Sequence, residues 1–340
     1  MQNKTSFLKK KGIEISVQRY FIDGLGAMAL GLFASLLIGV IIKTLGEQLH
    51  IEMLKNVGAL AMNDNLVGAT IGVAVAYGLK APPLVMFASA VAGAAGYLMG
   101  GPAGSFIATV IGAEFGKLVS KETPVDIIIT PLTVILIGYA AAGTVGPVIS
   151  YGMKELGNFI EWATELQPIP MGIIVAVVMG LALTAPISSA ALAIMMELSG
   201  IAAGAATVGC AAQMVGFAVA SYRENGLDGI LAQGLGTSML QIGNIVKNPW
   251  ILLPPTVAGA ILGPFSTTIF KMTNLHLGAG MGTAGLVGQF TTITAMGLST
   301  NVLLKILLLH FVAPGIIALA VATYMYKIGF IKDGDMKLDL

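Results

Sequence analysis

The stretch Met179–Gln213, MGLALTAPISSAALAIMMELSGIAAGAATVGCAAQ, decides the fold of this chain. It lies in the interval 166–222, where Glu197 is the only acidic or basic residue. Because a helix needs about 20 apolar residues to cross a bilayer, this interval is long enough for two crossings. The first is interrupted at Thr184–Ala190, where Pro186 lacks a backbone donor and clashes with the preceding turn.

An interruption of this kind predicts a binding site. Broken backbone at membrane depth is tolerated only where it is buried in protein or lines a wet cavity. The segment Thr184–Ala190 therefore indicates a solute site, with the membrane carboxylate of Glu197 close by in sequence. The alternative is a proline kink packed on small residues, with Glu197 at a helix end near the lipid headgroups.

The composition predicts an integral membrane protein. Mean hydropathy is +0.88 and only 10% of residues are charged, against about 25% in a typical soluble domain. The 44 glycines fit close helix packing in lipid, and the apolar runs are too long for a β-barrel. A net charge of +1 predicts no nucleic-acid partner. The single cysteine, Cys210, excludes an internal disulfide and a cysteine metal cluster, and we expect no metal site and no cofactor.

The apolar runs predict an all-α polytopic protein of about ten transmembrane helices. Two broken or re-entrant elements are expected in the C-terminal half, at Thr184–Ala190 and Thr237–Asn244. Upstream, residues 81–113 predict two short spans or a hairpin cut at Gly100–Pro102, and Lys117 marks an aqueous turn. The expected division is a basic interfacial segment over 1–20, an N-terminal transmembrane half over 21–125, a C-terminal transmembrane half with the solute site over 126–326, and a cytoplasmic tail over 327–340.

Charges at the two ends predict the topology. Lysine and arginine outnumber acidic residues in segment 1–20, and Lys327, Lys332 and Lys337 follow the last apolar run. Because basic residues stay on the cytoplasmic side, both termini are expected in the cytoplasm.

Two carboxylates are candidate coupling residues. Glu197, in apolar surroundings, either finds partners or takes up a proton. Asp64, between Asn63 and Asn65, lines a cavity or belongs to the N-cap of a helix that starts at Leu66.

Several motifs between Pro131 and Met196 resemble a known family. A Pro–Leu-rich span is followed by Gly146-Pro147, an amphipathic connection and a span that ends in Ala185–Ala191, APISSAA. This order resembles the membrane permease subunit, enzyme IIC, of the bacterial phosphoenolpyruvate-dependent sugar phosphotransferase system. Fructose-type members of that glucose/fructose superfamily end the same span in GGPVNKAA. Gly68–Leu84 is also similar to an upstream span of the family, and the chain most resembles the perfringolysin-regulator-like branch.

The chain departs from the family at the sugar-binding groups. Where members carry Glu in an ITEGAIPF-like motif, this chain has TSMLQIGN with Met239 at that position. A PHGG-like motif stands here as Leu277–Gly280, and the family's Asn-Lys pair is replaced by two serines. The resemblance and the interruptions together give these expected substrate-binding residues: Pro186, Ser188, Ser189, Glu197, Ser238, Gln241, Asn244 and His276.

The resemblance implies a transporter of a small polar, sugar-like solute that works by alternating access. It also implies a homodimer in the bacterial plasma membrane, with the N-terminal half at the dimer interface. Separate phosphotransferase subunits are the expected partners, because the chain has no phosphorylatable His or Cys in a soluble domain. Two alternatives stay open: a proton-coupled transporter of a non-sugar solute that uses Glu197 or Asp64, and a membrane-embedded ligand sensor or regulator that does not transport.

Overall fold

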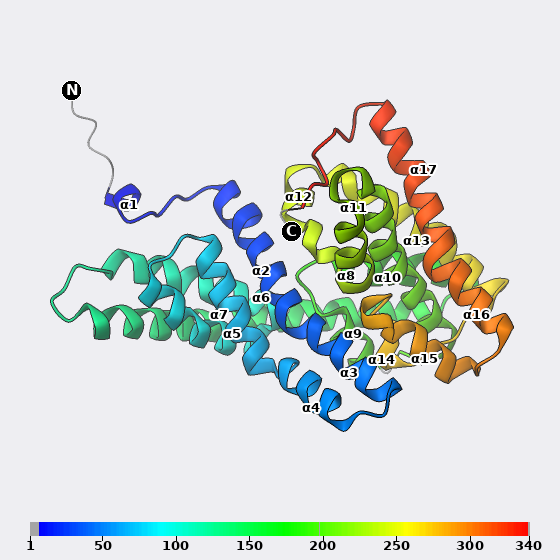
Figure 1. Cartoon of the computed structure of the whole chain (residues 1–340), viewed down its shortest axis with the longest axis horizontal. Coiled ribbons are helices and arrows are strands. Elements are labelled where there is room, and N and C mark those ends of the chain that lie inside the picture. The colour runs from blue at the N-terminus through cyan, green and yellow to red at the C-terminus, as the bar shows by residue number, and fades with distance from the viewer. Residues whose placement is uncertain (1–6, 197, 339–340) are drawn as a thin grey trace. The chain divides into compact units, whose positions relative to one another are not determined.

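The computed structural model describes residues 7–196 and 198–338 (Figure 1). Throughout these ranges the regular elements are helices, and one isolated backbone bridge joins Gly200 to Asn274. The predicted all-α class is therefore confirmed. Glu197 lies outside the described residues.

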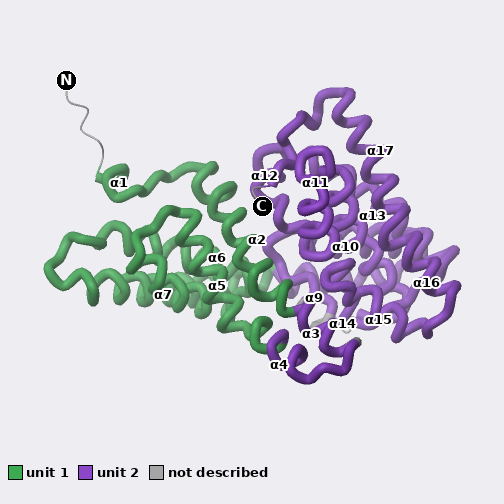
Figure 2. Tube along the Cα trace, in the orientation of Figure 1, with its two compact units in different colours: residues 1–39, 59–152 green, residues 40–58, 153–340 purple. Residues whose placement is uncertain are grey.

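The chain forms two compact units (Figure 2). Unit 1 consists of residues 1–39 and 59–152, and unit 2 of residues 40–58 and 153–340. The helices up to Thr164 are α1 (Phe7–Lys10), α2 (Leu25–Leu32), α3 (Ile38–Gln48), α4 (Glu52–Ala61), α5 (Asp64–Gly78), α6 (Pro83–Val119) and α7 (Asp126–Thr164).

Helix α6 folds back on itself as a hairpin. Its backbone leaves helical geometry at Gly100 and at Gly101, where φ is +61°, a left-handed value that glycine adopts without strain. The two arms approach closely, since a Cβ on Gly96 would lie 2.4 Å from the Gly104 carbonyl oxygen. Each arm is roughly 26 Å long at 1.5 Å per residue, slightly less than a hydrocarbon core of about 30 Å.

Six helices of the described chain are long and apolar enough to cross a membrane. The number rises to seven if the bent pair α4–α5, with 53° between its axes, counts as one span. The α6 hairpin is among the six, as one element. About ten crossings therefore stays a prediction.

Unit 2 is built around α10 (Gly200–Ala220), whose residues are almost all buried. It packs against α8 (Pro168–Thr184), α13 (Leu253–Thr268) and α17 (Ala313–Lys327). The α8–α10 contact needs glycine, because a Cβ on Gly209 would lie 1.9 Å from the Ala176 carbonyl oxygen. The remaining helices are α9 (Ser189–Met195), α11 (Tyr222–Leu231), α12 (Ile242–Lys247), α14 (His276–Ala279), α15 (Val287–Met296) and α16 (Thr300–Ile306).

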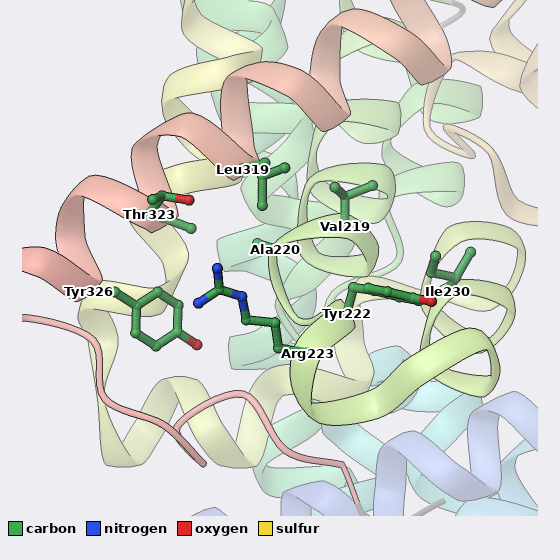
Figure 3. Close-up of a pocket in the computed structure, with 9 residues that line it drawn as sticks. Val219, Ala220, Tyr222, Arg223, Ile230, Leu319, Thr323 and Tyr326 are labelled. Carbon is green, nitrogen blue, oxygen red and sulfur yellow. The ribbon is translucent and has the colours of Figure 1, made fainter.

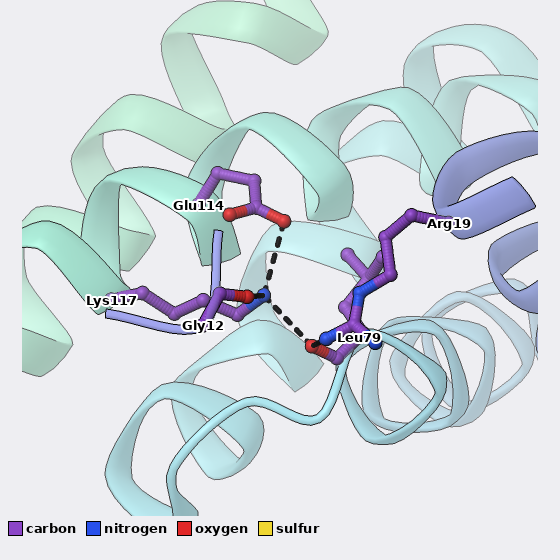
Figure 4. A network of polar contacts seen from close by, with 5 residues as sticks. All are labelled: Gly12, Arg19, Leu79, Glu114 and Lys117. Carbon is purple, nitrogen blue, oxygen red and sulfur yellow. Dashed lines mark hydrogen bonds and ion pairs between the residues drawn. The ribbon is translucent and has the colours of Figure 1, made fainter. Parts of the chain in front are cut away.

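Unit 1 contains a buried ion network, which corrects the expectation that Lys117 marks an aqueous turn (Figure 4). The Lys117 side chain is 1% exposed and its Nζ lies 3.0 Å from Glu114 Oε1. Lys117 Nζ also donates to the Leu79 carbonyl oxygen at 2.8 Å, and Arg19 donates to the same oxygen. Hydropathy predicts that a lysine near a chain reversal lies in water. Helix α6 instead continues past Lys117 to Val119, and the Lys117 side chain is buried inside unit 1.

Candidate functional site

The first interruption of unit 2 separates α8 from α9. Helix α8 ends at Thr184, and Ala185 adopts an extended backbone with ψ of 163°. This conformation is expected before Pro186, because a proline disfavours the helical region for the residue that precedes it. Helix α9 begins at Ser189, so a short non-helical segment lies inside the apolar stretch.

The second interruption begins at Thr237, which is extended with φ of −159° and ψ of 143°. Its hydroxyl accepts a hydrogen bond from the backbone N–H of Met239 at 3.1 Å, and a 3-10 turn, Ser238–Gln241, follows. Helix α12 then starts at Ile242. A threonine at this position caps the turn through its side-chain oxygen.

The structure brings the two interruptions into contact. The hydroxyl oxygens of Thr184 and Ser238 lie 2.7 Å apart. Thr184 also donates to Gln213 Oε1 of α10 at 3.2 Å, and Gln213 Nε2 donates to Thr256 Oγ1 of α13 at 2.9 Å. We call these four residues, Thr184, Gln213, Ser238 and Thr256, the hydroxyl–amide junction.

A cluster of side-chain amides continues from the junction along the chain. Gln241 Nε2 donates to Gln233 Oε1 at 2.9 Å, and Asn244 Nδ2 donates to Gln241 Oε1 at 2.8 Å. All three side chains are buried. We call Gln233, Gln241 and Asn244 the amide cluster. Its members carry donors and acceptors but no fixed charge.

The C-terminal tail covers the amide cluster. Gln241 Nε2 donates to the Met336 carbonyl oxygen at 2.9 Å, and Asn244 Nδ2 donates to that of Lys337 at 2.8 Å. The Asn225 side chain holds the same segment from α11, donating to the Met336 carbonyl oxygen and accepting from Leu338 N–H, both at 2.8 Å. Met336 itself is fully buried. The tail therefore occupies donors that two of the expected site residues present.

Other expected site residues lie elsewhere in unit 2. Ser189 is buried and donates to the Gly280 carbonyl oxygen at 2.7 Å. Pro186 and Ser188 are half-buried in the non-helical segment before it. His276 starts α14, is half-buried, and forms no hydrogen bond with any described residue. The sequence prediction places Ser189 and His276 in one site with Ser238, Gln241 and Asn244, but among the described residues no hydrogen bond links these two to that group.

Asp64 belongs to unit 1. It is exposed at the first position of α5, and Asn63 caps this helix by accepting from the backbone N–H of Asn65 at 3.1 Å. The helix thus begins two residues before the predicted start at Leu66. The acidic group lies near a helix N-terminus, where the backbone dipole favours negative charge.

Gln289 of α15 forms a second buried polar pair with His310, which lies in the helical segment immediately before α17. Gln289 Nε2 and His310 Nδ1 are 3.0 Å apart, and Gln289 also donates to the Gly282 carbonyl oxygen at 3.3 Å. Gln289 Oε1 and His310 Nε2 are buried and have no partner among the described residues. The described ranges hold no group of three or more His, Cys, Asp or Glu side chains placed to bind a metal.

A comparison with known protein families identifies the family of this chain. The chain matches the family described as Phosphotransferase system, EIIC, over residues 22–338. It belongs to this EIIC family. The earlier resemblance to enzyme IIC is confirmed at this level, and EIIC membership makes the chain a multi-pass membrane protein of sugar transport that works with phosphotransferase components. No curated protein and no solved structure matches the chain.

Proposed function

We propose that this EIIC protein is a permease for a neutral, sugar-like solute that binds at the hydroxyl–amide junction and the amide cluster. The contact between Thr184 and Ser238 carries the proposal. It joins two interrupted elements whose contacting residues are 54 positions apart in the chain. Interrupted helices in transporters supply solute sites near the middle of the membrane, because their backbone groups can face a cavity there.

The chemistry of these side chains favours a neutral ligand. Hydroxyl and amide groups both donate and accept hydrogen bonds, as do the hydroxyl groups of a sugar. Met239 stands where the related motif has a Glu, and its side chain is buried beside Ser238 in the 3-10 turn. A site without a fixed charge suits a neutral polar solute better than an ion, which would need compensating charge in low dielectric.

A solute can bind at the amide cluster only if the cluster gives up its hydrogen bonds to the C-terminal tail. Buried polar groups are almost always hydrogen-bonded, and Gln241 and Asn244 meet this requirement with tail carbonyls. We infer that solute oxygens take these donors when the tail segment around Met336 moves away. The described conformation is then one end of an alternating-access cycle.

The membrane arrangement that goes with this function has about ten crossings. Each arm of the α6 hairpin crosses once, and the two interrupted elements of unit 2 are re-entrant. Both termini lie in the cytoplasm of a bacterial cell, the segment 21–125 forms the dimer scaffold, and the segment 126–326 carries the solute. Phosphoryl transfer is supplied by separate subunits, and we place the chain in the perfringolysin-regulator-like branch of the glucose/fructose superfamily.

A ligand sensor is the second candidate. Replacement of the family's Glu by Met239 favours it, because this change removes an acceptor that would grip a sugar during transport. Uptake of radiolabelled hexoses into proteoliposomes separates the two: a permease accumulates or exchanges the label, and a sensor binds it without uptake. Proton coupling predicts instead that uptake follows an imposed proton gradient and that Glu197→Gln or Asp64→Asn abolishes this dependence.

Thermal unfolding across a panel of neutral hexoses and polyols tests the binding site. A ligand at 100 times its Kd stabilises the folded state by about 2.7 kcal/mol. Ser238→Ala should remove most of this stabilisation. Ser89→Ala is the matched control, because Ser89 is equally buried in unit 1 but donates only to its own helix, to the Val85 carbonyl oxygen. Loss of the ligand effect in both variants, or in neither, would contradict the proposed site.

A further inference from the structure

A cavity of about 370 Å³ lies in unit 2, and no residue of the hydroxyl–amide junction lines it (Figure 3). Its walls come from the end of α10, from α11 and from the last turns of α17. Val219, Ala220, Ile230, Leu319 and Ala322 make these walls mostly apolar. Such a surface accepts an acyl chain.

One cation faces this apolar cavity. The Arg223 side chain extends from the start of α11 toward Thr323 and Tyr326 of α17 (Figure 3). Arg223 forms neither a hydrogen bond nor an ion pair with any described residue. A guanidinium group carries a fork of N–H donors that matches a phosphate in two-point geometry.

The acidic groups nearby are partly engaged elsewhere. Glu224 accepts from the Tyr326 hydroxyl at 2.7 Å and from Met336 N–H at 2.9 Å. Asp335 accepts from Asn248 Nδ2 at 2.7 Å. Asp228 and Asp333 stay exposed, where water and salt screen their charges. The guanidinium of Arg223 therefore keeps its charge available to an outside anion.

The ends of two helices place the cavity at the depth expected for lipid headgroups. Two of the helices able to cross a membrane end beside it, Gly200–Ala220 and Thr300–Lys327. Arg223 follows the first by three residues and Tyr326 precedes the end of the second. Arginine and tyrosine are typical of this depth, because their polar ends reach the interface while their apolar parts stay in the membrane.

We propose that this cavity binds one anionic phospholipid, with the phosphate on Arg223 and an acyl chain along the apolar walls. The phosphate is the group recognised, and the walls distinguish a lipid from a free phosphate ion. One basic residue near an anionic lipid surface is worth about fivefold in affinity. No residue of the hydroxyl–amide junction or the amide cluster lines this cavity, and the lipid measurement below involves no solute, so it is tested separately from the proposed transport.

Native mass spectrometry of the full-length, delipidated protein tests the proposal. Phosphatidylglycerol and phosphatidylcholine with identical acyl chains are titrated, and the Kd of the first bound lipid is measured. We expect the wild type to prefer phosphatidylglycerol, and Arg223→Gln to weaken that lipid about fivefold while leaving phosphatidylcholine unchanged. Lys327→Gln is the matched control, because this basic residue ends α17, one of the helices around the cavity, but does not line the cavity itself.

Three results would overturn the proposal. Equal losses in Arg223→Gln and Lys327→Gln would show a diffuse effect of surface charge. Absence of any preference for phosphatidylglycerol in the wild type would remove the phosphate contact. Thermal stabilisation of the wild type by inorganic phosphate alone, lost in Arg223→Gln, would identify a free ion as the ligand. If Arg223→Gln does not fold, Thr323→Trp replaces it: filling the cavity should abolish the preference, and its retention would contradict the site.

Discussion

Replacement of Lys117 by methionine should be among the most damaging single changes in unit 1. The Lys117 ammonium lies 3.0 Å from the Glu114 carboxylate, which is 13% exposed, so both charges are largely removed from water. At this separation and an effective dielectric constant near 20, their attraction is about 5.5 kcal/mol before desolvation is subtracted. Removing one partner of such a buried pair leaves the other charge uncompensated and costs about 3–5 kcal/mol.

A double-mutant cycle measures this coupling. Equilibrium unfolding in mixed micelles is followed for Lys117→Met, Glu114→Gln and the double variant. The double variant should be more stable than the sum of the single losses predicts, because no bare charge is left. Lys121→Met is the control, since this exposed lysine forms no ion pair with a described residue and its loss should change stability by no more than about 0.5 kcal/mol. Additive losses in the cycle, or equal losses at positions 117 and 121, would refute the reasoning.

Three more predictions concern unit 2. Gly209→Ala should separate α8 from α10 and lower the unfolding temperature, because the new methyl group overlaps the Ala176 carbonyl. The control Gly143→Ala, in open space, should be neutral or slightly stabilising. Equal unfolding temperatures for the two variants would contradict the close packing of α8 and α10. Asn225→Ala removes two hydrogen bonds to the tail and should speed digestion of the C-terminus by carboxypeptidase, and an unchanged rate would show that Asn225 does not hold the tail. His310→Leu removes one of the two hydrogen-bond partners of the buried Gln289 amide nitrogen and should cost about 1–3 kcal/mol by equilibrium unfolding, so a neutral variant would count against that hydrogen bond.

Local chemistry in the sequence predicts the interruptions of unit 2. Pro186 is incompatible with an unbroken helix whatever surrounds it, and α8 ends two residues earlier, at Thr184. Gly100 and Gly101 likewise predict the hairpin in α6, because glycines can adopt the backbone angles of a tight reversal. Features of this kind depend on a few neighbouring residues, and they are accessible without a structure.

Pairings between distant residues could not be predicted in the same way. Gln213 is a polar residue inside a long apolar run, but nothing local to α10 indicates its partners Thr184 and Thr256. The contact of Gln241 with the Met336 carbonyl oxygen spans 95 positions in the chain and involves a backbone group, which leaves no trace in the amino-acid pattern. The packing of whole helices decides which distant residues form such hydrogen bonds.

The burial of Lys117 shows where hydropathy misleads. Its position near the end of an apolar run is typical of a lysine in water. Three acceptors, from Gly12, Leu79 and Glu114, instead satisfy the ammonium group inside unit 1. The apolar residues around it give no sign that these acceptors come together.

The central claim is that the solute occupies the place where the two interruptions meet. Ser238→Cys in a Cys210→Ser background gives a single thiol at that place, because Cys210 is the only cysteine of the chain. Its rate of alkylation by a small membrane-permeant reagent is measured with and without a hexose that is first shown to stabilise this variant against thermal unfolding, beside Ser89→Cys as the control. The account predicts that the hexose slows alkylation of position 238 and leaves position 89 unchanged. Equal rates at position 238 with and without a hexose that stabilises the protein would place the solute elsewhere and contradict the claim.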